Sequence, residues 1–124
     1  MILCDTNIII ELLKGSEKTI GIVNKIGIEE LTVSSITEME LYYGAFNKRE
    51  IQFIKKHLSS LPIIHVTKEI SMRSVNLIEQ FSKSHKLSIP DAFIAATALE
   101  FHYELLTYNL KDFKFIPGLR LHKI

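Results

Sequence analysis

Five residues in four separate stretches of the chain place oxygen-bearing side chains where a metal-dependent reaction could use them. Asp5 follows an apolar start, Glu40 lies in TEMELYYG, and Asp91 stands before AFIAATAL. Asn109 and Asp112 occur together in LLTYNLKDF. Clustered carboxylates repel one another unless a cation lies among them. Their oxygens suit Mg²⁺ or Mn²⁺, which can activate water and neutralise charge during in-line attack on a phosphodiester.

Each carboxylate also has a purely structural interpretation. Asp5 and Asp112 could cap helices, because aspartate is among the best N-cap residues. Glu40 shares a helix face with mostly apolar residues, whereas Glu38 lies about 200° away around the helix axis, so one of the two is the more exposed. Asp91 is the strongest single candidate. The segment after it is apolar on every side, which indicates a buried helix, and a helix N-terminus favours an anion.

The elements that must bring these side chains together alternate along the chain. Apolar segments predict strands at residues 2–4, 31–34, 61–66 and 104–107 and an edge strand at 119–122. Helical patterns cover residues 7–14, 16–26, 36–46, 48–60 and 67–84 and the segment from 90, with a short turn at 110–113. This alternation indicates an α/β fold with a mostly parallel sheet of four to five strands and helices on both faces. Such sheets bind ligands at the carboxyl ends of their strands, where the candidate residues fall.

Composition limits the classes of protein that the chain can represent. Its 124 residues predict one domain, residues 1–124. A net charge of +1 lacks the basic excess of a dedicated duplex-binding protein. A single cysteine cannot form an internal disulfide, and no zinc spacing occurs, so we expect a reducing, cytoplasmic location. We expect no signal peptide and no membrane span. The mean hydropathy of +0.17 favours an apolar partner surface.

Four stretches in order resemble the motifs of the PIN-domain family, and more narrowly those of the VapC-type toxins of toxin–antitoxin pairs. They are Asp5-Thr6-Asn7, Ser34-Ser35-Ile36-Thr37 with Glu40-Leu41-Tyr42-Tyr43-Gly44, Asp91-Ala92-Phe93-Ile94-Ala95-Ala96, and Leu106-Thr107-Tyr108-Asn109 with Asp112-Phe113. The similarity extends from Met1 to about Leu121. It implies a three-layer α/β/α sandwich, a homodimer, a cognate antitoxin that blocks the site, and a Mg²⁺-dependent endoribonuclease that could also use Mn²⁺.

The resemblance also assigns roles to residues of this sequence. Asp5, Glu40 and Asp91 match the acidic metal-site residues of the family. Thr6 and Asn7 match the polar residues beside the first of them.

The fourth acidic position of the wider family falls on Asn109, an amide that could ligate a metal through its carbonyl. Asp112 lies three residues further on and could compensate through a water molecule.

The expected substrate is single-stranded or looped RNA, with tRNA among the candidates. Scattered cations and stackable tyrosines could contact it: Lys14, Lys48, Arg49, Lys111, Tyr42, Tyr43 and Tyr108. Each of these also fits an ordinary solvated, core or interface position.

Three other interpretations explain less of the sequence. A dinucleotide-binding module needs a glycine-rich turn after a strand, and the five glycines do not form one. A phosphatase with a strand-end aspartate needs a second acid two residues on, where Asn7 stands. A non-catalytic scaffold or partner-binding protein would explain the apolar composition, but not acids at several strand or helix ends.

Overall fold

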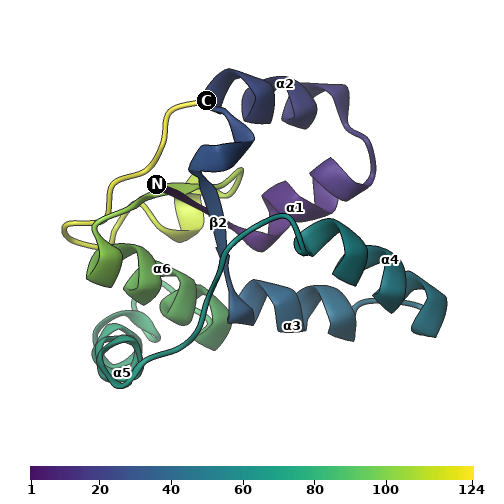
Figure 1. Ribbon diagram of the computed structural model, residues 1–124. Helices are drawn as coiled ribbons and strands as arrows, with labels where there is room; N and C mark the ends of the chain where they lie inside the picture. Colours follow the sequence, from purple (N-terminus) through teal and green to yellow (C-terminus); the bar gives the residue numbers. More distant parts are fainter.

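A four-stranded parallel sheet forms the centre of the computed structural model, which describes residues 1–124 (Figure 1). The strands are β1 (Ile2–Cys4), β2 (Leu31–Ser34), β3 (Ile63–Ile64) and β4 (Glu104–Leu106). Their order across the sheet is β3-β2-β1-β4, and every neighbouring pair is parallel. The predicted α/β class is confirmed, with four strands.

Two α-helices connect each strand to the next one in sequence. They are α1 (Thr6–Leu13), α2 (Glu17–Ile26), α3 (Ser35–Tyr43), α4 (Lys48–Leu58), α5 (Lys68–Phe81) and α6 (Ile89–Phe101). Short 3₁₀ turns η1 (Ile28–Glu30) and η2 (Leu110–Asp112) complete the set. All six α-helices follow a residue whose side chain accepts a backbone N–H of the first turn: Asp5, Ser16, Ser34, Asn47, Thr67 and Ser88. These caps fix where each helix begins.

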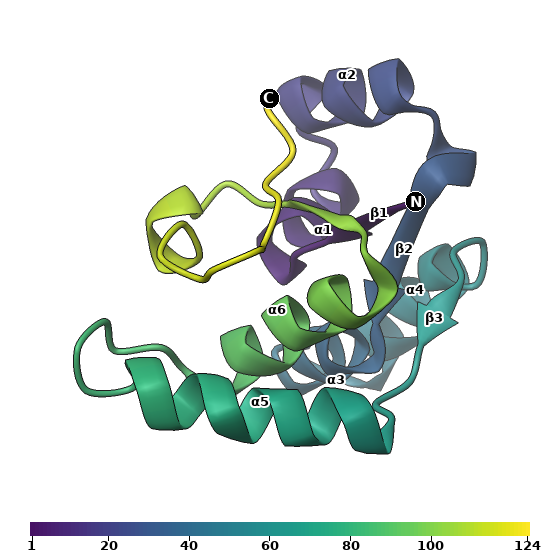
Figure 2. The same ribbon diagram turned by 90° about the vertical axis from the view of Figure 1, so that its left-hand side faces the viewer.

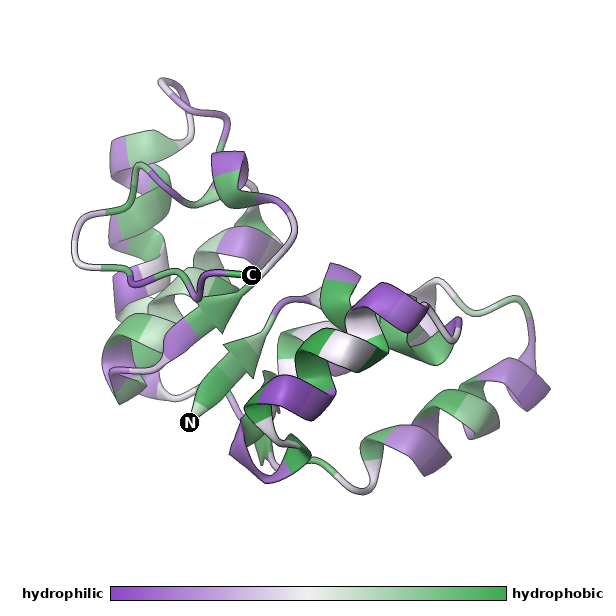
Figure 3. Cartoon of the chain, turned by 90° about the horizontal axis from the view of Figure 1, so that it is seen from above, coloured by the Kyte–Doolittle hydropathy of each residue, from purple (hydrophilic) through white to green (hydrophobic).

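The sheet separates two hydrophobic cores. Leu3 and Leu105 belong to the core formed with α5 and α6, whereas Cys4 and Leu106 belong to the core on the side of α1, α2 and α4. In Figure 1, α5 and α6 lie on one side of β2, and α1 and α4 lie on the other. Strand β1 is apolar along its whole length, as its hydrophobic colour beside the N label shows (Figure 3), whereas the fully buried β2 includes Thr32 and Ser34. This arrangement is the predicted α/β/α sandwich.

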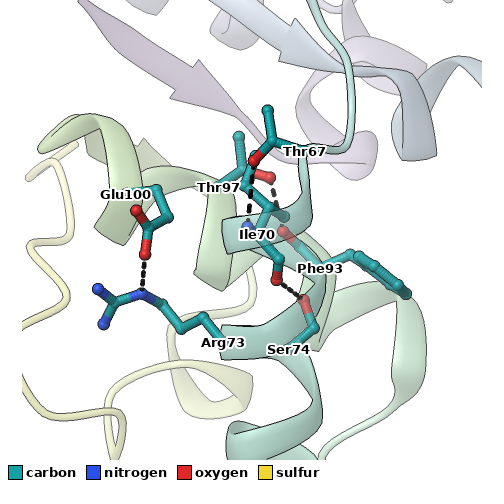
Figure 4. Close-up of polar contacts among 7 residues, drawn as sticks. All are labelled: Thr67, Ile70, Arg73, Ser74, Phe93, Thr97 and Glu100. Atoms are coloured by element: carbon teal, nitrogen blue, oxygen red, sulfur yellow. Dashed lines mark hydrogen bonds and ion pairs between the residues drawn. The ribbon is translucent and has the colours of Figure 1, made fainter.

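Helices α5 and α6 run side by side, and their buried hydroxyl groups are satisfied locally (Figures 2 and 4). Ser74 and Thr97 each donate to the carbonyl one turn earlier in the same helix, at 2.7 Å. At the surface, Arg73 pairs with Glu100 at 2.7 Å. No buried hydroxyl in this pair of helices is therefore left without a partner. The first turn of α6 thus belongs to a well-packed layer.

The structure corrects several predicted boundaries. The strand expected at 61–66 is only β3, because Pro62 precedes it without an N–H and contributes its carbonyl alone, to Val33 N–H and Thr32 Oγ1. The edge strand expected at 119–122 is a single bridge between Leu105 and Leu121.

The third helix ends at Tyr43 rather than at residue 46, the fourth at Leu58 rather than at 60, and the fifth at Phe81 rather than at 84. Helix ends are the least certain part of a periodic pattern. None of the helices is both long and apolar enough to cross a lipid bilayer.

Candidate active site

Asp5 stands at the carboxyl end of β1 and is only 5 % exposed. Its backbone N–H continues the ladder to β4 by donating to the Leu106 carbonyl at 2.9 Å. Its Oδ1 accepts the Thr6 N–H at 2.8 Å, and its Oδ2 accepts the Thr107 hydroxyl at 2.7 Å. Asp5 is thus the N-cap of α1, as one interpretation of the sequence expected, and its carboxylate is also held in a fixed orientation at the sheet edge.

Glu40 reaches the same edge from α3 and is held by a short chain of hydroxyl groups. Thr6 donates its hydroxyl proton to Glu40 Oε1 at 2.6 Å. Thr37 Oγ1 lies 2.9 Å from Thr6 Oγ1 and must be the donor there, because the Thr6 proton is already engaged. Glu40 is the more exposed of the two glutamates in this helix, and Glu38 is half-buried and accepts the Tyr42 hydroxyl at 3.0 Å. The apolar face expected around Glu40 is therefore not a buried one.

Asp91 lies in the first turn of α6, and its backbone N–H donates to the Ser88 hydroxyl at 3.2 Å. Burial raises the pKa of Asp91 to about 6, and the negative charges of Asp5, Asp112 and Glu40 add to the rise. A protonated acid avoids both the loss of hydration and the repulsion. Three other carboxylates, from distant parts of the chain, therefore act on the charge of Asp91.

Burial also raises the pKa of Asp5, although the hydrogen bonds from Thr107 and Thr6 oppose the rise. The charges of Glu40 and Asp112 raise it further. The chain contains three aspartates, and all of them contribute to this acidic cluster.

The fourth carboxylate of the cluster comes from Asp112, which is exposed in η2. Asn109 is also exposed, and its backbone N–H donates to Thr107 Oγ1 at 2.9 Å. Asp112 adds charge that both Asp5 and Asp91 feel. Of the two residues that the sequence offered for this place, only Asp112 carries a charge, and the choice between them stays a prediction.

Thr107 was not singled out from the sequence as a site residue, yet it is fully buried and connects two parts of the site. Its hydroxyl donates to Asp5 Oδ2 and accepts the Asn109 N–H. The only available signal was a hydroxyl residue at the end of a strand, a common position for threonine. A single sequence could not have shown its role.

Asn7, in the first turn of α1, contacts the loop after β4. Its Oδ1 accepts the Tyr108 N–H at 3.5 Å, and its Nδ2 is buried without a hydrogen-bond partner. Tyr108 is itself fixed, with its hydroxyl 2.5 Å from Thr19 Oγ1 and the Lys18 ammonium 5.0 Å from its ring centre. The loop after β4 is therefore held on both sides.

The acidic cluster has the donor chemistry of a hard-cation site. No lysine or arginine forms an ion pair with any of its four carboxylates. No three acidic, histidine or cysteine side chains converge as direct ligands of one ion. Mg²⁺ usually binds through one or two carboxylates and keeps several waters, so this open oxygen set fits it. The neighbouring Cys4 is fully buried in the core on the α1 side of the sheet, and this burial raises the pKa of its thiol to about 12.

Comparison with known proteins identifies the family and several relatives of this chain. The model of the family described as "PIN domain" matches residues 2–118. "Ribonuclease VapC2" of Haemophilus influenzae is 33% identical, with 94% of this chain and 92% of that protein covered. "tRNA(fMet)-specific endonuclease VapC" of Salmonella typhimurium is 26% identical over the same shares.

Solved structures resemble the whole fold. A toxin–antitoxin complex from Klebsiella pneumoniae contains a chain that is 36% identical, with a TM-score of 0.81 and full coverage of both chains. The DNA-bound VapBC complex from Salmonella typhimurium gives 25% identity and a TM-score of 0.85, covering 98% of this chain and 96% of that one.

Proposed function

The chain belongs to the PIN-domain family, and from that premise we propose that it is a metal-dependent endoribonuclease, the toxin of a toxin–antitoxin pair. The observation that carries this proposal is the cluster of four carboxylates at the carboxyl edge of the sheet, with no basic side chain paired to it. Relatives along nearly the whole length are named ribonucleases, which supports the same activity. We propose residues 1–124 as one nuclease domain.

In this proposal Asp5, Glu40 and Asp91 hold Mg²⁺, with Mn²⁺ as a substitute, and Asp112 or Asn109 completes the site. When bound, the ion supplies charge neutralisation at a phosphate and acidifies a coordinated water. The two hydrogen bonds to Asp5 fix its carboxylate before substrate arrives. Thr6 holds one oxygen of Glu40 and leaves the other without an intramolecular partner. The chain thus supplies preoriented oxygens, as efficient catalysis requires.

We also propose a cognate antitoxin as a partner, because the similar solved structures are toxin–antitoxin complexes. A homodimer is supported by exposed apolar side chains on and beside α5 and α6, namely Met72, Val75 and Ile89. The name of the Salmonella relative makes tRNA the first substrate to test. A non-catalytic scaffold is the alternative function, and it leaves the repulsion among the carboxylates unexplained.

The proposed function can be tested by incubating the purified protein with total tRNA and with unstructured RNA. Cleavage is expected with Mg²⁺ or Mn²⁺ and not with EDTA. Discrete new RNA ends, mapped by sequencing, would identify the substrate. Cleavage that continues undiminished in EDTA would contradict the metal site. No cleavage of any RNA with either ion would favour the scaffold.

The two glutamates of α3 provide a matched pair of variants. Glu40→Gln is expected to lower kcat/KM for RNA cleavage by about 10- to 100-fold, the usual cost of disturbing a metal site. Glu38→Gln should change it less than about twofold, because Glu38 bonds only to the Tyr42 hydroxyl. Equal losses in the two variants would show that the wrong face of α3 has been assigned to the site.

A further inference from the structure

Helix α4 carries a concentration of positive charge that nothing in the chain neutralises. Lys48, Arg49, Lys55 and Lys56 occur within its 11 residues, beside a single acid, Glu50, although the whole chain has a net charge of only +1. All four cations are exposed, and none forms an ion pair. Such a set of unpaired cations on one helix is typical of a surface that binds a polyanion such as nucleic acid.

Exposed aromatic rings lie beside these cations. Tyr43 ends α3 and is 95% exposed, and Phe46 in the connection to α4 is 93% exposed. Phe53 on α4 is 47% exposed, with its ring centre 4.3 Å from that of His57. Tyr42 and Tyr108, by contrast, are engaged with Glu38 and Thr19. The free aromatic surface is therefore concentrated on the segment from Tyr43 to His57, which we call the α3–α4 arm.

A cavity of about 490 Å³ lies between this arm and α1, and one residue of the acidic cluster, Glu40, lines it. Phe53 and Glu50 of α4 contribute to its lining, and so does Lys14, the residue that follows α1. Figure 1 shows α4 on the side of the molecule away from α5. An RNA segment bound along the arm would therefore lie next to a cavity that both Phe53 and Glu40 line.

We propose that the α3–α4 arm binds a single-stranded segment of the RNA substrate and directs it to Glu40. The inference rests on the proposed ribonuclease function. The cations of the arm bind phosphates, and RNA bases stack on its aromatic rings. Proteins that bind single-stranded nucleic acid combine these two kinds of contact. A paired duplex keeps its bases stacked inside and would leave the aromatic rings unused.

Charge argues against a second copy of this chain as the occupant. In a symmetric dimer the same patch lies on both subunits, so pairing through the arm would bring eight unpaired cations into one interface. Like charges placed opposite each other oppose association. The arm is thus better suited to RNA than to self-association.

The test measures RNA binding apart from cleavage, by fluorescence anisotropy of a labelled, unstructured RNA in EDTA over a range of salt concentrations. Two variants, Lys48→Gln/Arg49→Gln and Lys55→Gln/Lys56→Gln, each remove two charges from the arm. Each should weaken binding about tenfold and reduce the slope of log K against log salt by about 1.4, or 0.7 per cation. Lys25→Gln/Lys123→Gln removes two charges at the opposite edge of the sheet and should change neither value.

The aromatic part of the arm has a different signature. Tyr43→Ala/Phe46→Ala should weaken binding about tenfold through lost stacking, with the salt slope unchanged. Thermal unfolding should change little, because both side chains are almost fully exposed.

Equal RNA affinity in the arm and control variants would overturn the inference. It would also be overturned if the arm variants bound RNA as the wild type does but lost dimerisation in sedimentation, or lost binding to the antitoxin. The proposed function would fail by a different result. A wild-type protein that binds RNA through the arm but cleaves no RNA with Mg²⁺ or Mn²⁺ would contradict the nuclease activity and still support RNA binding by the arm.

Discussion

Asp5→Asn is expected to lower metal-dependent RNA cleavage by at least about 10³-fold, since a bound ion supplies several kcal/mol and each 1.36 kcal/mol is tenfold in rate. Asp5 is the most deeply buried member of the acidic cluster, at 5 % exposed. Both of its oxygens are already oriented by Thr6 and Thr107. Replacing one carboxylate oxygen by an NH₂ group removes a charged metal ligand. It also places a hydrogen-bond donor opposite either the Thr6 N–H or the Thr107 hydroxyl, which are donors themselves. The measurement is kcat/KM on the RNA identified by end mapping.

The fold of Asp5→Asn should survive, because its amide oxygen can still cap α1 and the cost of burying a charge disappears. Circular dichroism and thermal unfolding check this. Glu11→Gln is the matched control: it changes the same charge on the same helix, at a residue paired only with the exposed Lys14 at 3.7 Å. A folded Asp5→Asn variant that cleaves RNA at the wild-type rate would remove Asp5 from the mechanism.

Much of this site could be predicted from the sequence, because topology determines where strand-end residues go. In a parallel sheet the carboxyl ends of the strands share one edge, so an acid directly after β1 and one in the first turn of α6 must approach each other. The rule accounts for their shared edge, and the ordered resemblance to the PIN-domain motifs singled out Asp5 and Asp91 among the acids of the chain. This rule about strand ends places the backbone of each residue, however, and it says little about which side chains contact one another.

The parts that could not be predicted depend on side-chain contacts and on local exposure. The hydroxyl chain from Thr37 through Thr6 to Glu40 needs two helices in a particular register. The contribution of Asp112 depends on the path of the loop after β4, where residue type favoured neither it nor Asn109. Which of Glu38 and Glu40 is the more exposed stayed open, because periodicity counts apolar residues without showing whether another element covers them.

Asp91→Asn is expected to stabilise the metal-free protein near neutral pH while it abolishes the response to metal. The pKa of Asp91 is about 6 in the folded protein against 3.8 ordinarily. Between these values the folded state binds more protons than the unfolded state, so stability falls as pH rises through this window and stays low above it. Asparagine cannot ionise and avoids this loss. After allowance for partial exposure and for the lost interaction with the helix N-terminus, the gain is about 1 kcal/mol, or about 3–5 °C in Tm, at about pH 7.5.

The pH dependence separates this effect from a general change in packing. The advantage of the variant should shrink at about pH 4.5, where Asp91 of the wild type is protonated in the folded state. An advantage of equal size at both pH values would mean that the charge of Asp91 is not its origin.

Added metal should reverse the order of the Tm values of the wild type and Asp91→Asn. A ligand that binds only the folded state raises the free energy of unfolding by RT ln(1 + [L]/Kd), so Mg²⁺ or Mn²⁺ should raise the Tm of the wild type and not that of Asp91→Asn. The repulsion that weakens the metal-free protein is the same electrostatic term that attracts the cation. If Asp91 had only a structural role, removing its charge would raise the Tm at every metal concentration. A crossover of the two Tm values with added metal is therefore the result that distinguishes a metal site from a strained helix terminus.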